Sequence, residues 1–279
     1  KTAASVGSVH LTVPEIMSIR ELSFDRSGER TVNDSTHQYH IYRLDRAMAP
    51  GDSAIMRFRL EYRRRGFGND VTSLFLVENG SFMHSMMIMP TIGYSDNLEL
   101  ADDDAREREG LKPKERMRPP TDTAALRNNY IGNDSDWIDF EATISTDPDQ
   151  TALAPGYLQR EWTEAGRRFF HYTMDTPILN FWAVVSARYQ VKRDRWVPAG
   201  AATGEPVDIS VHYHPEHTYN VDRMITSVKR SLDYFTAHFG PYHHRQIRIV
   251  EFPRYLPFAQ SLPDLIPYSE AVGVIARGR

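Results

Sequence analysis

Alternation of hydrophobic and polar positions is the main pattern in the first two thirds of the chain. Residues 54–63 alternate apolar with charged positions, and the apolar ones are Met56, Phe58, Leu60 and Tyr62. A period of two residues predicts a strand that buries one face and leaves the other in water. The same pattern predicts strands over 137–145 and 207–213, and a longer one over 181–191.

Turn-forming residues separate these strand-like segments. They include Pro50–Gly51, Asn79–Gly80, Pro155–Gly156 and residues 198–200. Many short strands with this punctuation predict an antiparallel β-sandwich. The pattern breaks in an excursion near 96–136, where we expect one short helix that ends at Gly110, followed by a polar, Pro-rich loop.

The period changes near residue 217, from two residues to three and four. It predicts an amphipathic helix that begins after Asn220 as its cap, continues to His238 and ends at Gly240. Its apolar face consists of Val221, Met224, Ile225, Val228, Leu232 and Phe235. Residues 246–252 predict one more strand, and the apolar run after Glu270 also looks strand-like. We therefore expect a mostly β fold, in which an α/β segment follows the β-sandwich.

Composition narrows the classes of function. The chain has 279 residues, 41% of them hydrophobic and 25% charged, which is typical of a globular protein. Its net charge is −4, so the chain has no excess of basic residues. Its densest basic run, residues 63–65, follows a predicted strand and is expected to be a solvated turn. Nucleic acid is therefore not an expected partner. The absence of Cys excludes disulfides, thiol catalysis and Cys-bound zinc. The chain begins with Lys1 rather than Met, so we expect it to be a trimmed piece of a longer protein.

Histidines form the most visible candidate metal site. His212, His214 and His217 fall within six residues, and the first two point to the same face of a strand. Three imidazoles can bind zinc. The alternative is an ordinary polar strand face, which the absence of an evident orienting acid favours. His243 and His244 are adjacent in a turn, so their side chains do not easily share a metal ion.

Complete catalytic motifs are absent from the sequence. It contains no H-E-x-x-H zinc-protease helix, no G-x-S-x-G nucleophile elbow and no phosphate-binding Gly-rich loop. Motifs alone therefore give this chain no complete catalytic machinery.

The C-terminal quarter resembles the gluzincin, aminopeptidase N-like metallopeptidases. A helix leads to "FGPYHHRQIRIVEFPRY" and then to "PYSEAVGVI", so that "SEAVG" stands where the family has M-E-N-W-G. Glu270 and Gly273 match, whereas five neighbouring positions depart from G-A-M-E-N-W: Pro267, Tyr268, Ser269, Ala271 and Val272. These departures put the family's usual aminopeptidase specificity in doubt.

Several longer phrases resemble a bacterial branch of this family, which is fused to membrane segments like an ABC-transporter permease. They are "RRGFGND", "NGSF", "MPTIGYSDNLEL", "STDPDQTALAPGYL", "HPEHTYNVDRM" and "EFPRYLPFAQSLPDLIPYSE", and they span roughly residues 35–279. The resemblance implies a β-sandwich domain over 1–213 and the truncated start of a thermolysin-like catalytic domain over 214–279. It also implies a membrane tether through segments outside this chain and a location on the extracytoplasmic face of a bacterial membrane.

The resemblance assigns one site residue. It implies that Glu270 binds the α-amino group of a peptide substrate. The family also has a glutamine or an equivalent residue of the β-sandwich near that amine, and Asn79 or a neighbour is a candidate for that position. The zinc ion and its ligands would lie beyond Arg279, in the remainder of the catalytic domain, so this chain itself would contribute no metal ligand and no catalytic group. The rival hypothesis is that the chain is a non-catalytic β-sandwich module, which serves either as an interaction domain or as an accessory domain of a transporter. The next residues of the gene distinguish the two hypotheses, because H-E-x-x-H within a few dozen residues supports the enzyme.

Overall fold

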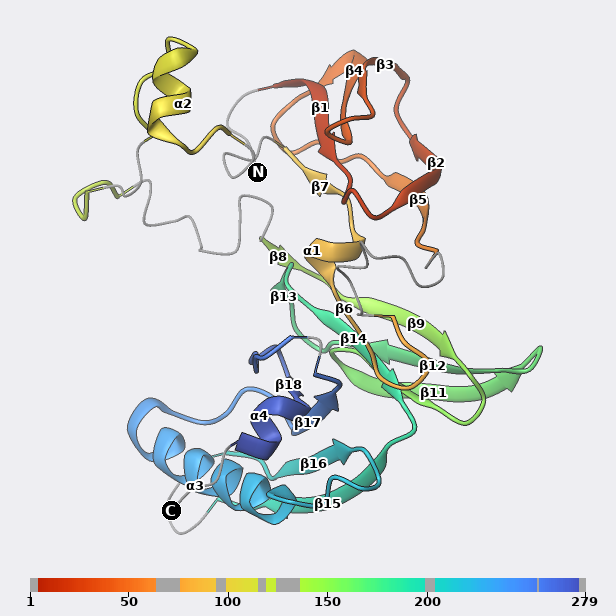
Figure 1. The fold of residues 1–279 in the computed structure, drawn as a ribbon, viewed down its shortest axis with the longest axis vertical. Helices are drawn as coiled ribbons and strands as arrows, with labels where there is room; N and C mark the ends of the chain where they lie inside the picture. Colours follow the sequence, from red (N-terminus) through yellow and green to blue (C-terminus); the bar gives the residue numbers. More distant parts are fainter. Residues whose placement is uncertain are drawn as a thin grey trace. The chain divides into compact units, whose positions relative to one another are not determined.

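The computed structural model describes residues 5–63, 76–93, 99–114, 119–123, 136–198, 204–254 and 256–275. Strands dominate these residues, and most of their sheets are antiparallel (Figure 1). The chain divides into two compact units, Lys1–Arg63 with Met86–Asp136 and Arg64–Ser85 with Trp137–Arg279. The predicted fold class, mostly β with a following α/β segment, is confirmed. The phrase at residues 64–70 lies outside the described residues.

The first unit is a two-layer β structure. One antiparallel sheet has the strand order β3-β4-β1-β7, and a second sheet pairs β2 with β5. The strands are β1 (Val6–Thr12), β2 (Ser18–Phe24), β3 (Gly28–Asp34), β4 (Tyr39–Met48), β5 (Met56–Glu61) and β7 (Thr91–Ile92). Both sheets contribute to one core around Leu11, Val13 and Met17. The alternation predicted over residues 54–63 is confirmed in β5.

Two short helices accompany these strands. They are α1 (Ser85–Ile88) and α2 (Asp103–Arg108). The Asp102 carboxylate accepts a hydrogen bond from the Ala105 backbone N–H at 2.9 Å, which caps α2. Gly110, with φ of 68°, follows the helix in the left-handed region. The short helix predicted within residues 96–136 is confirmed, and much of the remaining excursion lies outside the described residues.

The second unit begins with three antiparallel sheets, ordered β10-β14-β6, β11-β12-β9 and β13-β8. Their strands are β6 (Ser81–His84), β8 (Trp137–Ile138), β9 (Glu141–Thr146), β10 (Thr151–Leu153), β11 (Tyr157–Glu164), β12 (Arg167–Thr173), β13 (Ile178–Leu179) and β14 (Ala183–Ala187). The single strand predicted over 137–145 is wrong, because β8 pairs with β13 whereas β9 pairs with β12. The chain changes sheets between the two strands.

The longer strand predicted over 181–191 is also divided. It ends as β14 at Ala187, and β15 (Gln190–Trp196) starts a different sheet. Between them, the Arg188 backbone N–H donates to Asn79 Oδ1 at 2.8 Å, and the Tyr189 hydroxyl donates to the Glu251 carbonyl at 2.8 Å. These two contacts are formed outside the strand ladder, and the sequence pattern does not reveal them.

The last sheet has the order β15-β16-β17-β18 and carries both remaining helices. Its other elements are β16 (Val207–Tyr213), α3 (Val221–Phe239), β17 (Gln246–Phe252), β18 (Leu265–Ser269) and α4 (Glu270–Ile275). Strands β16, β17 and β18 are parallel, and α3 forms the crossover between the first two. This sheet continues across the predicted domain boundary between residues 213 and 214, and that boundary stays a prediction.

Helix α3 covers one face of this sheet (Figure 1). Val221, Ile225 and Leu232 are buried against β16 and β17, as the periodicity predicts, whereas Phe235 is exposed. The predicted cap at Asn220 is wrong in its chemistry. Asn220 adopts a left-handed conformation with φ of 64° and makes no side-chain cap. Its Nδ2 instead donates to the Gly273 carbonyl at 2.7 Å, which ties the start of α3 to α4.

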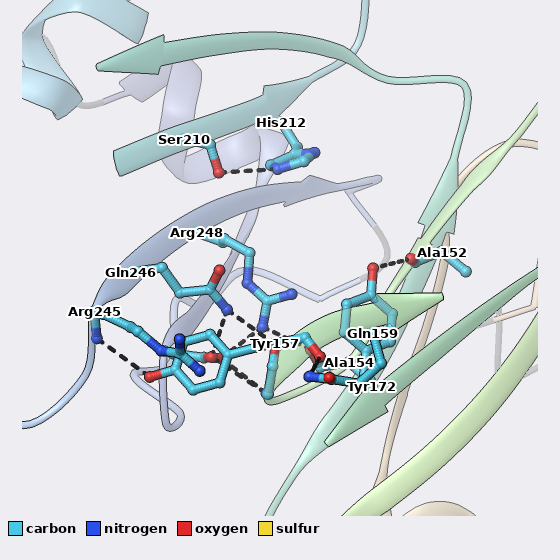
Figure 2. Close-up of polar contacts among 12 residues, drawn as sticks. Ala152, Ala154, Tyr157, Gln159, Tyr172, Ser210, His212, Arg245, Gln246 and Arg248 are labelled. Carbon is cyan, nitrogen blue, oxygen red and sulfur yellow. Dashed lines mark hydrogen bonds and ion pairs between the residues drawn. The ribbon is translucent and has the colours of Figure 1, made fainter. Parts of the chain in front are cut away.

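A buried polar network fixes β17 to the loop before β11 (Figure 2). Arg248 donates to Asp264 Oδ1 at 2.6 Å and to the Ala154 carbonyl at 2.7 Å. Gln246 Nε2 donates to the Gly156 carbonyl at 2.9 Å and to Asp264 Oδ2 at 2.7 Å. Because Arg248 and Asp264 are buried and their hydrogen bonds join β17 to this loop, the network holds β17 at one position along the sheet.

Among the residues that the structure describes, no helix combines the length and the hydrophobicity required to cross a membrane.

Candidate functional site

The candidate site lies at the carboxyl ends of β16, β17 and β18. These three parallel strands end near His214, Glu251 and Glu270, respectively. Carboxyl ends of parallel strands meet at one edge of a sheet, where ligand sites of α/β proteins commonly form. Three residues that are distant in sequence therefore come together at this edge.

Glu251 is the buried member of the site. It belongs to β17, and only 1% of its side chain is exposed. Its Oε2 accepts the His214 backbone N–H at 2.7 Å, and its Oε1 lies 2.6 Å from His217 Nδ1. Burial raises the pKa of the Glu251 carboxyl, and the contacts with His214 and His217 oppose that rise.

His217 lies between the two acids. A turn after β16, closed by a 2.8 Å hydrogen bond from the His217 N–H to the His214 carbonyl, places it there. Its Nδ1 is 2.6 Å from Glu251 Oε1 and 3.9 Å from Glu270 Oε2, and 27% of its side chain is exposed. The Tyr219 ring stacks on the imidazole with ring centroids 5.6 Å apart.

Glu270 is the first residue of α4, not the start of a strand. The strand-like interpretation of the run after it is wrong, because a short apolar run is compatible with either element. The Arg254 backbone N–H donates to Glu270 Oε1 at 3.0 Å. The other oxygen, Oε2, is on the side of His217, and 30% of the Glu270 side chain is exposed.

Together, one donor atom each from His217, Glu251 and Glu270 lies within 4.8 Å of the others. In the part of the chain that the structure describes, this is the group whose His and acidic side chains lie close enough together to share a metal ion. The alternative zinc site of His212, His214 and His217 is therefore not assembled there, and neither His243 nor His244 joins such a group.

His212 and His214 have other surroundings. Both rings contact the Tyr189 ring, with centroids 6.0 and 5.7 Å away, so the two histidines do share a side of the strand. His212 is buried and bonds Ser210 through Nε2 at 3.0 Å (Figure 2). Burial lowers the pKa of His212 to about 3, so its imidazole is neutral at pH 7. Burial also lowers the pKa of His214.

The loop at Asn79–Gly80 contacts this edge of the sheet. Gly80 has φ of 130°, and a Cβ there would come within 2.3 Å of Pro253 and 3.6 Å of His214 Nε2. Asn79 itself accepts a hydrogen bond from Arg188 N. The loop is therefore next to the chain segment that follows Glu251, and the expected role of Asn79 near a substrate amine stays a prediction.

Sequence reasoning missed Glu251. No orienting acid is evident for the histidine cluster in the sequence pattern, yet Glu251 contacts His217 directly. The available signal was an acidic residue inside the apolar strand "QIRIVEF". An acid is rarely fully buried unless it has a partner, so its position within a buried parallel strand indicates a polar contact on another element.

Another groove of the second unit lies along α3. It has a volume of 660 Å³ and is lined by α3, the loop after it and β17, including the exposed Phe235 and Phe239. Its lining is mostly apolar and includes no Asp or Glu. His217, Glu251 and Glu270 do not line this groove.

Comparison with solved structures identifies the fold. The chain matches the M1 zinc metallopeptidase from Deinococcus radiodurans with a TM-score of 0.58 at 13% identity, over 96% of this chain and 53% of that one. It matches a mutant of a two-domain M1 zinc metallopeptidase bound to L-arginine with a TM-score of 0.57 at 14% identity, over 96% and 54% of the two chains. The match to a mutant of the Deinococcus radiodurans enzyme bound to a Tyr-Ser-Ala substrate has a TM-score of 0.53 at 13% identity.

These similarities confirm the resemblance to aminopeptidase N-like metallopeptidases at the level of fold. The chain spans about half the length of the peptidases it matches. No protein-family model matches the sequence, and no curated protein matches it.

Proposed function

We propose that this chain is the amine-recognition part of a zinc-dependent, aminopeptidase-like metallopeptidase, in which Glu270 binds the α-amino group of a peptide substrate. The observation that carries the proposal is the convergence of Glu270 and Glu251 on one point at the sheet edge. Among the described residues, their only ion-pair partner is His217. Two carboxylates with a single, weakly basic partner favour a cationic ligand.

An ammonium group fits this arrangement. It carries three N–H donors, and a charge-assisted hydrogen bond to a carboxylate is about twice as strong as a neutral one. Arg254 N–H fixes one Glu270 oxygen, so the other has a defined direction. A peptide fixed by its N-terminus is positioned for removal of one residue at a time.

Zinc belongs to the part of the proposal that concerns the intact protein. When bound, it polarises the scissile carbonyl and activates water. The proposal places its ligands in an H-E-x-x-H motif downstream of Arg279. Tethering to a membrane, and a location on its extracytoplasmic face, are also parts of the proposal, and they rest on the resemblance to the bacterial branch.

A binding experiment with the chain tests amine recognition. The unblocked tripeptide Tyr-Ser-Ala and its N-acetylated form are titrated against the chain by calorimetry. We expect the free amine to bind at least tenfold more tightly, and Glu270→Gln to remove that preference while Glu216→Gln, an exposed acid of the same region, retains it. Equal binding of both peptides would show that Glu270 does not anchor the amine.

A second experiment separates the enzyme from a non-catalytic β-sandwich module. The gene is read downstream of Arg279 for H-E-x-x-H, and the intact protein is assayed for release of N-terminal residues. Turnover that falls in Glu270→Gln supports the peptidase. Preference for a free amine without turnover, in an intact protein that lacks the motif, supports an interaction or transporter-accessory module.

A further inference from the structure

We propose that His217, Glu251 and Glu270 also form a binding site for a divalent transition-metal ion, with Zn²⁺ as the ion that the donor set fits. This site is separate from the zinc motif placed downstream in the proposed function, and it does not depend on that function. It contains one imidazole nitrogen and two carboxylate oxygens from three different segments.

The second oxygen of each acid is already held by the backbone. His214 N–H donates to Glu251 Oε2 at 2.7 Å, and Arg254 N–H donates to Glu270 Oε1 at 3.0 Å. The remaining oxygens, Glu251 Oε1 and Glu270 Oε2, both lie on the side of His217 Nδ1. Outer contacts of this kind orient metal ligands and increase affinity for the ion.

The spacing of the donors fits zinc after small side-chain movements. Tetrahedral zinc with bonds of about 2.1 Å places neighbouring ligand atoms roughly 3.4 Å apart. His217 Nδ1 is 2.6 Å from Glu251 Oε1 and 3.9 Å from Glu270 Oε2. Both of these separations have to change by less than an ångström, and all three donor atoms lie within 4.8 Å of one another. The partly exposed His217 and Glu270 side chains allow such movement.

Electrostatics favours a doubly charged ion at this point. Glu251 is almost completely buried, and neither acid forms an ion pair with a Lys or Arg side chain in the part of the chain that the structure describes. Two carboxyl groups that converge on one imidazole, with no Lys or Arg side chain paired to them in the described residues, form a site that suits a cation. The Tyr219 ring, stacked on His217, shields one side of the imidazole.

The donor types decide which ion fits. Ca²⁺ and Mg²⁺ prefer oxygen ligands and six or more positions, whereas a mixed imidazole and carboxylate set suits zinc. Three protein ligands leave a fourth position for water or another ligand. Because Glu270 is shared with the proposed amine site, Zn²⁺ and the peptide amine compete for it.

Calorimetric titration of the chelator-treated chain with Zn²⁺ tests this site. We expect uptake of about one ion per chain, because a single group of ligands is involved. Glu270→Gln and His217→Ala should each weaken the affinity by about tenfold or more, as loss of a metal-site contact does. Glu216→Gln and His243→Gln, both exposed, serve as matched controls and should bind as the parent does. Glu270 is partly exposed, so its variant keeps the fold and circular dichroism verifies this.

Several results would overturn the proposal. They are no uptake of Zn²⁺ by the parent chain, unchanged affinity in both site variants, or an equal loss in the Glu216→Gln control. X-ray absorption of the zinc-loaded chain should show one nitrogen and two carboxylate oxygens as protein ligands, and a shell with more than one imidazole would contradict the assignment. The titration contains no peptide, so failure of amine recognition leaves this result unaffected, and failure of zinc uptake leaves amine recognition unaffected.

Discussion

Glu251 Oε1 lies 2.6 Å from Nδ1 of His217, although the two residues are 34 positions apart in sequence. The contact joins the end of a buried parallel strand to the turn that precedes α3. It gives His217 a fixed orientation and leaves the partly exposed Glu270 facing the same point. The following predictions concern the contacts that hold this arrangement in place.

Removal of the Asp264 charge should destabilise the second unit strongly. Asp264 is fully buried and pairs with the buried Arg248, so Asp264→Asn leaves a buried guanidinium without its counter-charge. Loss of one partner of a buried pair costs about 3–5 kcal/mol of unfolding free energy. Urea unfolding followed by tryptophan fluorescence measures this, since all four tryptophans lie in the second unit. Asp175→Asn breaks an exposed pair with Arg245 and should change stability little.

Acid should destabilise the second unit through His212. Its pKa is lowered to about 3 by burial, while in the unfolded chain it is near 6.5. Between those two values the unfolded state binds the extra proton, so stability is lost as pH falls through that window, by up to about 1.4 kcal/mol per pH unit. His212→Gln should therefore show a shallower decrease in unfolding free energy between neutral and acidic pH. If the unfolding free energy decreased with falling pH at the same slope in His212→Gln and in the exposed control His243→Gln, the prediction would be contradicted.

Substitution of Asn220 should weaken the connection between α3 and α4. Its left-handed φ of 64° disfavours residues with a Cβ, and its side chain donates to the Gly273 carbonyl. Asn220→Ala loses both features and should cost about 1–3 kcal/mol. Asn220→Gly keeps the backbone conformation and loses only the hydrogen bond, so it should be the less destabilised of the two in urea unfolding. The opposite order would show that the conformation at Asn220 imposes no strain.

A side chain at Gly80 should disturb the edge of the sheet near Glu251. The Cβ of Gly80→Ala would come within 2.3 Å of Pro253, two residues after Glu251. Overpacking of this kind costs about 1–3 kcal/mol. Gly166 also has a positive φ, but no atom lies within 4 Å of a Cβ built there, so Gly166→Ala controls for backbone strain alone. Thermal unfolding should show a larger decrease in midpoint for Gly80→Ala than for Gly166→Ala.

The sequence by itself determined the element types that depend on local periodicity. Period-two alternation predicted β5 and β16, and spacings of three and four predicted α3, because burial of one face imposes that spacing on any strand or helix. The sequence pattern did not locate the strand ends at which the chain changes sheets, such as the break between Ala187 and Gln190. The contacts that form there come from Asn79 and Glu251, which are distant in sequence.

The candidate site shows the same division. The sequence pointed to Glu270 through its resemblance to aminopeptidase N-like peptidases and to His217 through the histidine cluster, but it treated them as unrelated. Only the parallel order of β16, β17 and β18 brings their ends to one edge and adds Glu251. Local pattern reports which face of an element is buried, whereas the pairing of strands distant in sequence decides which polar side chains meet.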